Sequence, residues 1–155
     1  MGATTRYYHL TNAANVGTVI TPGRWGTTVL GTPGHRWQPM EIYFEQARQA
    51  YAPLAASRLD AVFLFETHET AILFQEIQRP DDVLVEVELL GSPAHTHRGN
   101  VLLIHPSPDA VPWPGNAYAY WTSAGLHSTD AVPELLVDTP VRVTDVLHPG
   151  GRPTT

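Results

Sequence analysis

Apolar and polar positions alternate most clearly in residues 82–90, where valine or leucine occupies positions 83, 85, 87 and 89. A period of two residues is typical of a strand with one buried face. Shorter runs of apolar, β-branched and aromatic residues predict further strands. These runs cover residues 6–11, 16–20, 60–66, 101–104, 117–122, 134–137 and 141–147, with 117–122 expected at a sheet edge.

Two segments have the spacing of a helix. In residues 40–55, apolar side chains recur every three or four positions, with Glu41 and Glu45 on the polar side. A second helix follows Thr67, a suitable N-cap, and ends before Pro80. Gly and Pro residues predict loops or surface turns at 22–39, 92–100 and 105–116, and a hairpin or corner at 138–140.

The order of these elements predicts an α+β fold, with a mixed β-sheet and two main helices on part of its surface. A chain of 155 residues has the size of one domain, which we expect to span residues 1–147. Residues 148–155 are rich in Pro, Gly and Thr and predict a flexible C-terminal tail. No Gly-x-Gly-x-x-Gly sequence follows a strand, which argues against a βαβ dinucleotide-binding fold.

Composition narrows the possible chemistry. The net charge of −6 argues against a broad phosphate-binding surface. All nine basic residues are Arg, so neither a Schiff-base lysine nor a Walker-type phosphate loop is present. The absence of Cys excludes thiol catalysis, disulfides and Cys-ligated zinc. No leader and no apolar run of membrane-spanning length stands out, so we expect no membrane partner and a cytoplasmic protein, or an effector domain delivered into another cell.

Two polar side chains stand at the edges of apolar strands near opposite ends of the chain. His9 lies in Tyr-Tyr-His-Leu-Thr, and Glu134 opens Glu-Leu-Leu-Val-Asp. Between them, an aromatic strand and the helix after it run from Phe63 to Phe74. In this order and spacing, the three segments resemble the motifs of the His-Tyr-Glu class of the ADP-ribosyltransferase superfamily.

The resemblance implies a split-sheet ADP-ribosyltransferase-like domain of the small bacterial mono-ADP-ribosyltransferase type. Such an enzyme uses NAD as a substrate, releases nicotinamide and transfers ADP-ribose to an acceptor. Glu134 is then the catalytic residue. The residues that the resemblance places around NAD are His9, Leu10, Thr11, Phe63, Phe65, Thr67 and Phe74. The acceptor, which is a protein, a nucleic acid or a small molecule, is not indicated, and a toxin-like role stays open.

Three positions depart from the family pattern. Leu10 replaces the Gly that commonly follows the first His, which leaves less room for nicotinamide. Phe63 or Phe65 stands where Tyr is usual, so ring stacking is kept and a hydroxyl is lost. Val132 replaces the Glu or Gln of arginine-modifying members, which argues against arginine as the acceptor. The first two departures support an alternative, a catalytically degenerate module of the same fold that binds NAD or a protein.

The chemistry of NAD cleavage supports the roles of Glu134 and His9 independently of the resemblance. Cleavage of the bond between nicotinamide and ribose builds positive charge on the sugar, as in glycoside hydrolysis. A carboxylate fixed at a strand end, as expected for Glu134, stabilises that charge. His9 needs only one hydrogen bond to a ribose hydroxyl, so a neutral imidazole suffices. Arg6, Arg24 or Arg58 could bind the diphosphate, and Arg58 is the favoured candidate.

Other interpretations remain open at the level of sequence. His95 and His97 could bind zinc or iron together with His105 or His127 in a barrel of cupin type. The loop residues on either side of this pair favour a surface turn instead. The interpretation as an ADP-ribosyltransferase predicts no metal. The segment with Trp25, Gly26, Gly34 and Trp37 is either a lid over bound NAD or a loop whose rings cover the core. The aromatic residues could simply be core, and His9 and Glu134 could be ordinary strand-edge residues.

Overall fold

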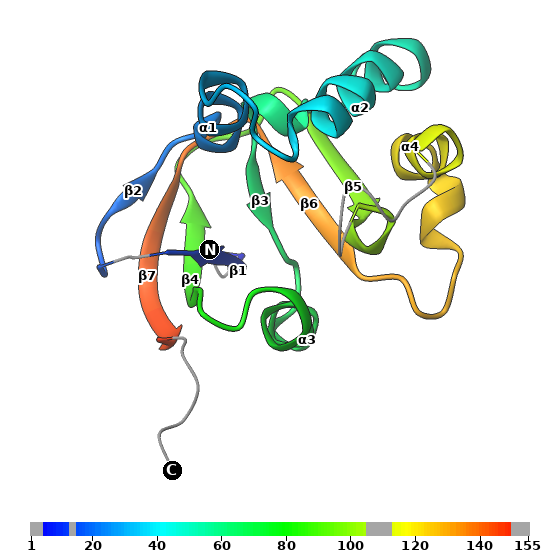
Figure 1. The fold of residues 1–155 in the computed structure, drawn as a ribbon. Coiled ribbons are helices and arrows are strands. Elements are labelled where there is room, and N and C mark those ends of the chain that lie inside the picture. Colours follow the sequence, from blue (N-terminus) through cyan, green and yellow to red (C-terminus); the bar gives the residue numbers. More distant parts are fainter. Residues whose placement is uncertain (1–4, 13–14, 105–112, 150–155) are drawn as a thin grey trace.

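The computed structural model describes residues 5–12, 15–104 and 113–149. This part of the chain forms four α-helices and two antiparallel sheets, which confirms the predicted α+β class (Figure 1). The helices are α1 (Arg24–Gly31), α2 (Gln38–Tyr51), α3 (His68–Gln78) and α4 (Trp113–Trp121), with short 3-10 turns η1 (Arg58–Asp60), η2 (Val101–Leu103) and η3 (Ser123–Leu126). The strands are β1 (Tyr7–Thr11), β2 (Val19–Ile20), β3 (Val62–Leu64), β4 (Val83–Leu89), β5 (Thr96–Asn100), β6 (Pro133–Val137) and β7 (Val141–His148).

The larger sheet has the strand order β1-β4-β7-β2, and the smaller sheet has the order β3-β6-β5. Every pairing between these strands is antiparallel, so the predicted mixed sheet was wrong. The reason is that α3 carries the chain from β3 in one sheet to β4 in the other, rather than forming a parallel crossover within one sheet. The two sheets meet where Tyr8 and Phe65 exchange backbone hydrogen bonds of 3.0 and 2.8 Å.

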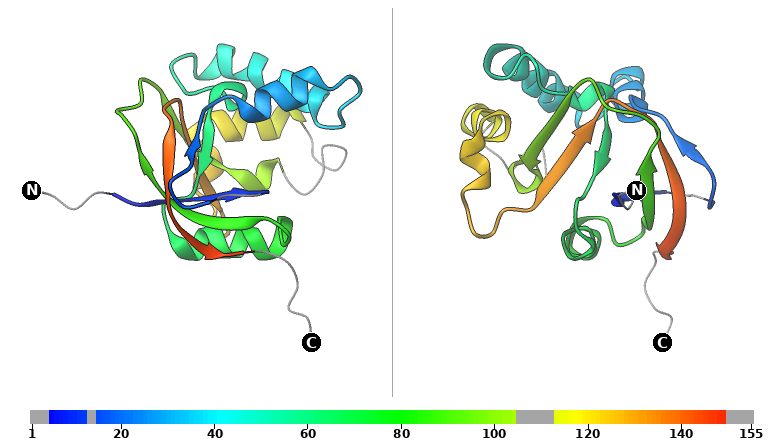
Figure 2. Two further views of the ribbon diagram at one scale, coloured as in Figure 1. Left: turned by 90° about the vertical axis from the view of Figure 1, so that its left-hand side faces the viewer. Right: turned by 180° about the vertical axis from the view of Figure 1, so that it is seen from behind.

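Apolar side chains of the two sheets pack against each other in the centre of the molecule. This core is made by Ile20, Val62, Leu64, Val85, Val87, Leu135, Val137, Val141 and Val143. On the other face of the smaller sheet, α2 and α4 pack around Leu136. The third cluster joins α3 to the larger sheet through Phe74 and Leu84. Figure 2 shows α3 at the end of the sheets opposite to α1 and α2.

The predicted loop at residues 22–39 was wrong, because it contains α1. Gly23 precedes this helix with a left-handed φ of 91°, which favours glycine. Gly26 permits close packing of α1 on η1, since a Cβ atom there would lie 2.0 Å from the Leu59 carbonyl oxygen. The glycines that suggested a loop therefore start a helix and allow its contact with a neighbour.

Three further predictions were wrong between residues 92 and 122. The predicted edge strand at 117–122 lies mostly in α4. This helix begins at Trp113, within the predicted loop at 105–116. Residues 105–112 of that loop lie outside the described residues. The predicted strand at 101–104 is the turn η2, capped by the Asn100 side chain. The predicted surface turn at 92–100 contains β5, which pairs with β6. Helix α4 buries Ala117, Tyr120 and Trp121 and has little polar surface, so its sequence lacks the usual helical alternation.

The strongest local signals were confirmed. Helices α2 and α3 and strand β4 lie where they were predicted, and Thr67 caps α3 by accepting a 3.2 Å hydrogen bond from the Thr70 amide. Residues 138–140 form a corner, because β6 and β7 belong to different sheets. Strand β7 includes His148, so it extends into the start of the predicted tail, and residues 150–155 lie outside the described part. Within the described residues, no helix combines the length and apolar character needed to span a membrane.

Candidate functional site

A cleft with a volume of about 570 Å³ opens beside the point where the two sheets meet. Cavities of this size bind small molecules and cofactors in other proteins. Most of the predicted site residues line it, namely His9, Leu10, Thr11, Arg58, Phe63, Phe65, Phe74 and Glu134. Thr67 does not, because its side chain caps α3. The structure therefore brings residues from both ends of the chain to one cavity.

The strand register explains this convergence. The bridge between Tyr8 and Phe65 sets β1 beside β3, and Leu64 pairs with Leu135 across β3 and β6. Continuing this register, Glu134 lies near Phe65, next to the bridge that carries β1. Figure 1 shows β3 and β6 side by side, with β1 crossing near β3. The first and last motifs thus reach the cleft through β3.

The His9 imidazole is fixed by one hydrogen bond. Its Nδ1 lies 2.7 Å from the Phe63 carbonyl oxygen. A carbonyl only accepts, so Nδ1 carries the proton and Nε2 of the neutral ring is an acceptor. His9 is half-buried, and desolvation by the surrounding protein lowers its pKa, opposed by the hydrogen bond to Phe63. The neutral ring can therefore accept a hydrogen bond from a ligand hydroxyl at neutral pH.

Glu134 belongs to a buried polar network centred on Arg58. Arg58 Nε donates to the two oxygens of Glu41 at 3.0 and 3.2 Å. Its Nη1 donates to the Tyr120 hydroxyl at 2.9 Å and forms a short ion pair with Glu134 Oε1. The Tyr120 hydroxyl in turn donates to the same Glu134 oxygen at 2.7 Å. Within the described residues, Arg58 and Tyr120 thus both fix Oε1 of the Glu134 carboxylate.

Burial makes these charges interdependent. The exposed fractions of Glu41, Arg58 and Glu134 are 1%, 5% and 4%. Burial opposes charge on Arg58, yet Glu41, Tyr120 and Glu134 hold its pKa well above the usual range. Burial raises the pKa of Glu41 against the attraction of Arg58, and burial also raises the pKa of Tyr120 well above its usual value. Arg58 therefore acts as the shared cation of two carboxylates, and its predicted contact with a diphosphate stays a prediction.

The three predicted aromatic residues are not equivalent. The Phe65 and Phe74 rings contact each other directly, with centroids 5.4 Å apart and planes tilted by 40°. That spacing is typical of contacting rings and leaves no gap for a third ring between them. Phe63 is half-buried and lies 4.9 Å below the Arg58 guanidinium carbon. Phe63 is therefore the most exposed of the three rings that line the cavity.

The tryptophan segment forms a wall of the cleft. Trp25 lies on α1, Trp37 directly precedes α2, and both line the cavity. The Trp25 indole N–H is buried without a hydrogen-bond partner within the described residues. The segment is therefore not a loop throughout but contains a helix that borders the cleft, and its role as a lid over NAD stays a prediction.

A family model described as a protein of unknown function, DUF2441, matches residues 35–149. The chain belongs to this family. The matched segment contains Glu41, Arg58, Tyr120 and Glu134, whereas β1 with His9 and α1 precede it. No curated protein matches the chain. All four members of the buried network are therefore part of the segment by which this DUF2441 protein is recognised.

The metal-site alternative finds no support in the described residues of this DUF2441 protein, which contain no group of three or more His, Asp or Glu side chains placed to hold a metal ion. His95 contacts Asp138 at 2.9 Å, and His97 donates from Nε2 to the Tyr120 carbonyl at 2.8 Å. His105 lies outside the described residues.

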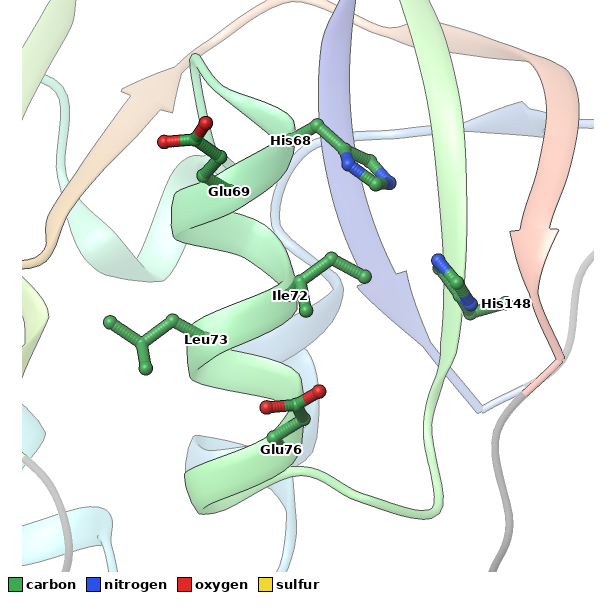
Figure 3. Close-up of a pocket in the computed structure, with 6 residues that line it drawn as sticks. All are labelled: His68, Glu69, Ile72, Leu73, Glu76 and His148. Carbon is green, nitrogen blue, oxygen red and sulfur yellow. The ribbon is translucent and has the colours of Figure 1, made fainter. Parts of the chain in front are cut away.

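Figure 3 shows a separate open depression on α3, where His68 and His148 face each other with ring centroids 5.7 Å apart.

Sequence reasoning missed Glu41 and Tyr120. Glu41 was placed on the polar face of its helix and Tyr120 in an edge strand, yet both side chains are buried against Arg58. A carboxylate in the first turn of an amphipathic helix gives no sign of burial, because it also suits the helix dipole there. Their roles depend on tertiary packing.

Loss of Arg58 tests the network. We expect Arg58→Met to reduce the free energy of unfolding by about 3–5 kcal/mol, because it leaves two buried carboxylates without their cation. The matched control is Arg98→Met, which breaks an ion pair with Glu66 whose side chains are 53% and 38% exposed, and should cost at most about 1 kcal/mol. Urea unfolding of both variants measures the difference, and equal losses would contradict a structural role of the network.

The pH dependence of stability tests the two buried imidazoles. Burial lowers the pKa of His9 and of His97 below the ordinary value of 6.5. As pH falls from 6.5 towards these lowered pKa values, the unfolded chain binds protons that the folded chain does not, so the free energy of unfolding decreases. The pKa of Glu41 is raised, which has the opposite effect: the free energy of unfolding decreases as pH rises above 4.5. This contribution is the same in the wild type and in a histidine variant, so it cancels when the two proteins are compared.

We therefore expect the double variant His9→Asn, His97→Gln to lose less stability than the wild type between about pH 7.5 and about pH 5.5. The amides keep donors towards the Phe63 and Tyr120 carbonyls. Urea unfolding at both pH values measures the change, and an identical pH dependence of the two proteins would refute the lowered pKa values.

Proposed function

We propose that this protein is an NAD-dependent mono-ADP-ribosyltransferase with a split-sheet fold of the ADP-ribosyltransferase type. The observation that carries the proposal is that His9 of the first strand and Glu134 of a late strand line the same cleft. A cleft of about 570 Å³ has room for a small-molecule substrate. The adjacency of β1 to β3, and of β3 to β6, also fits a sheet that is split around the site.

Glu134 supplies the chemistry of the proposed reaction. As the bond from nicotinamide to ribose breaks, the bonding electrons leave with nicotinamide and positive charge develops on the sugar. A carboxylate stabilises that charge best when it is already fixed and shielded from water. Tyr120 and Arg58 hold Oε1 of Glu134, and burial excludes water from the group. Glu41 places a second carboxyl group in the same wall.

His9 and Phe63 are the proposed contacts to the rest of the substrate. The unprotonated Nε2 of His9 accepts from a ribose hydroxyl, and the half-buried Phe63 ring packs against nicotinamide. Leu10 and Thr11 border the same space from β1. The acceptor stays open among a protein, a nucleic acid and a small molecule, and transfer of a single ADP-ribose is proposed rather than polymer synthesis.

A second candidate is a module that binds NAD without cleaving it. The observation that favours it is the Arg58 ion pair, because a cation beside Glu134 offsets part of the negative charge that the reaction needs. The direct contact between Phe65 and Phe74 and the presence of Leu10 point the same way. This candidate predicts NAD binding, seen as a raised melting temperature, with no release of nicotinamide.

Glu134→Gln tests the proposed reaction. We expect the rate of nicotinamide release from NAD, followed by chromatography, to fall at least about a hundredfold, because the fixed carboxylate stabilises the transition state by about 2–4 kcal/mol. Glu69→Gln, on the exposed side of α3, is the matched control and should keep the wild-type rate. Melting temperatures establish that both variants are folded. A Glu134→Gln rate equal to that of the wild type would rule out this role.

A further inference from the structure

Three arginines line the cleft, and they differ in their partners. Arg58 is buried and shared by two carboxylates. Arg79, the C-cap residue directly after α3, lies 2.6 Å from Asp82, although this ion pair is not aligned as a hydrogen bond. Arg24, the first residue of α1, donates to the Val19 carbonyl at 3.2 Å and forms no ion pair within the described part of the chain. Arg24 and Arg79 are both exposed, so their charge is available at the opening.

These two cations flank His9 from different elements. Arg24 comes from α1 and Arg79 from the end of α3, and both guanidinium groups are close enough to lower the pKa of His9 electrostatically. The carboxyl groups of Glu41 and Glu134, in contrast, are buried in the wall of the cleft. The cavity therefore has two exposed arginines at its opening, whereas its interior holds two carboxyl groups that share the single cation of Arg58.

We propose that Arg24 and Arg79 form a diphosphate-binding subsite at the opening of the cleft, and this assignment rests on the proposed use of NAD. Guanidinium groups bind phosphate oxygens in a bidentate way, and a diphosphate offers oxygens to two of them. The start of α1 adds favourable amide dipoles, because its N-cap Gly23 offers no side-chain acceptor to them.

The subsite also orients the ligand. With the diphosphate held at the opening by Arg24 and Arg79, the nicotinamide riboside extends inward past His9 towards Glu134. The positive pyridinium ring of NAD then faces the carboxylate end of the cavity, where the Coulomb interaction is favourable. A reversed ligand would place the uncharged adenine ring beside Glu134 in place of the pyridinium ring and would lose this attraction.

Binding of ADP-ribose and adenosine tests the subsite without any turnover. Isothermal titration calorimetry at low ionic strength should show that the wild type binds ADP-ribose more tightly than adenosine. Arg24→Gln and Arg79→Gln should each weaken ADP-ribose binding about tenfold or more, because each removes a charged hydrogen bond to phosphate. The affinity for adenosine should not change. Arg142→Gln, an exposed residue of β7 outside the cleft, is the matched control and should bind as the wild type does.

Three results would overturn the subsite: ADP-ribose binding unchanged in both variants, an equal loss of adenosine and ADP-ribose binding, or no binding of ADP-ribose by the wild type. Failure of the proposed reaction is separable from these results. If Arg24→Gln weakens ADP-ribose binding while the wild type releases no nicotinamide from NAD, the diphosphate subsite stands and the transferase activity does not.

Discussion

The site depends on the buried hydrogen bonds and ion pairs of the Arg58 guanidinium group. This group joins Glu41 of α2, Tyr120 of α4 and Glu134 of β6, and it comes itself from η1. Buried charges are tolerated only when they are paired and hydrogen-bonded, so these four elements are held in one arrangement. The same contacts fix the Glu134 carboxylate in the cleft wall. Stability and the proposed chemistry therefore share one network.

The cleft combines this fixed interior with a different environment around His9. There, one backbone carbonyl holds a neutral imidazole and two exposed arginines lie nearby. A ligand with a cationic ring at one end and phosphates in its middle complements that distribution of charge. The NAD molecule has this form, which is why the proposal explains the cavity as a whole and not only the motif residues.

The sequence predicted the elements whose signals are local. The alternation in β4, the Thr67 cap of α3 and the helical spacing of α2 depend on neighbouring residues, and all three were confirmed. Helices α1 and α4 and strand β5 were missed because packing, not local pattern, determines them. In the same way, His9, Phe63 and Glu134 could be selected one by one. The Arg58 network could not, since it joins residues 17, 62 and 76 positions apart.

A crystal structure of the protein bound to a non-cleavable analogue of NAD is the most direct test of the central claim, that the two ends of the chain build one nucleotide site. The account predicts a ribose hydroxyl within hydrogen-bonding distance of His9 Nε2 and the nicotinamide riboside beside Glu134. An analogue bound away from both residues, for example in the depression beside His68 and His148 (Figure 3), would contradict it.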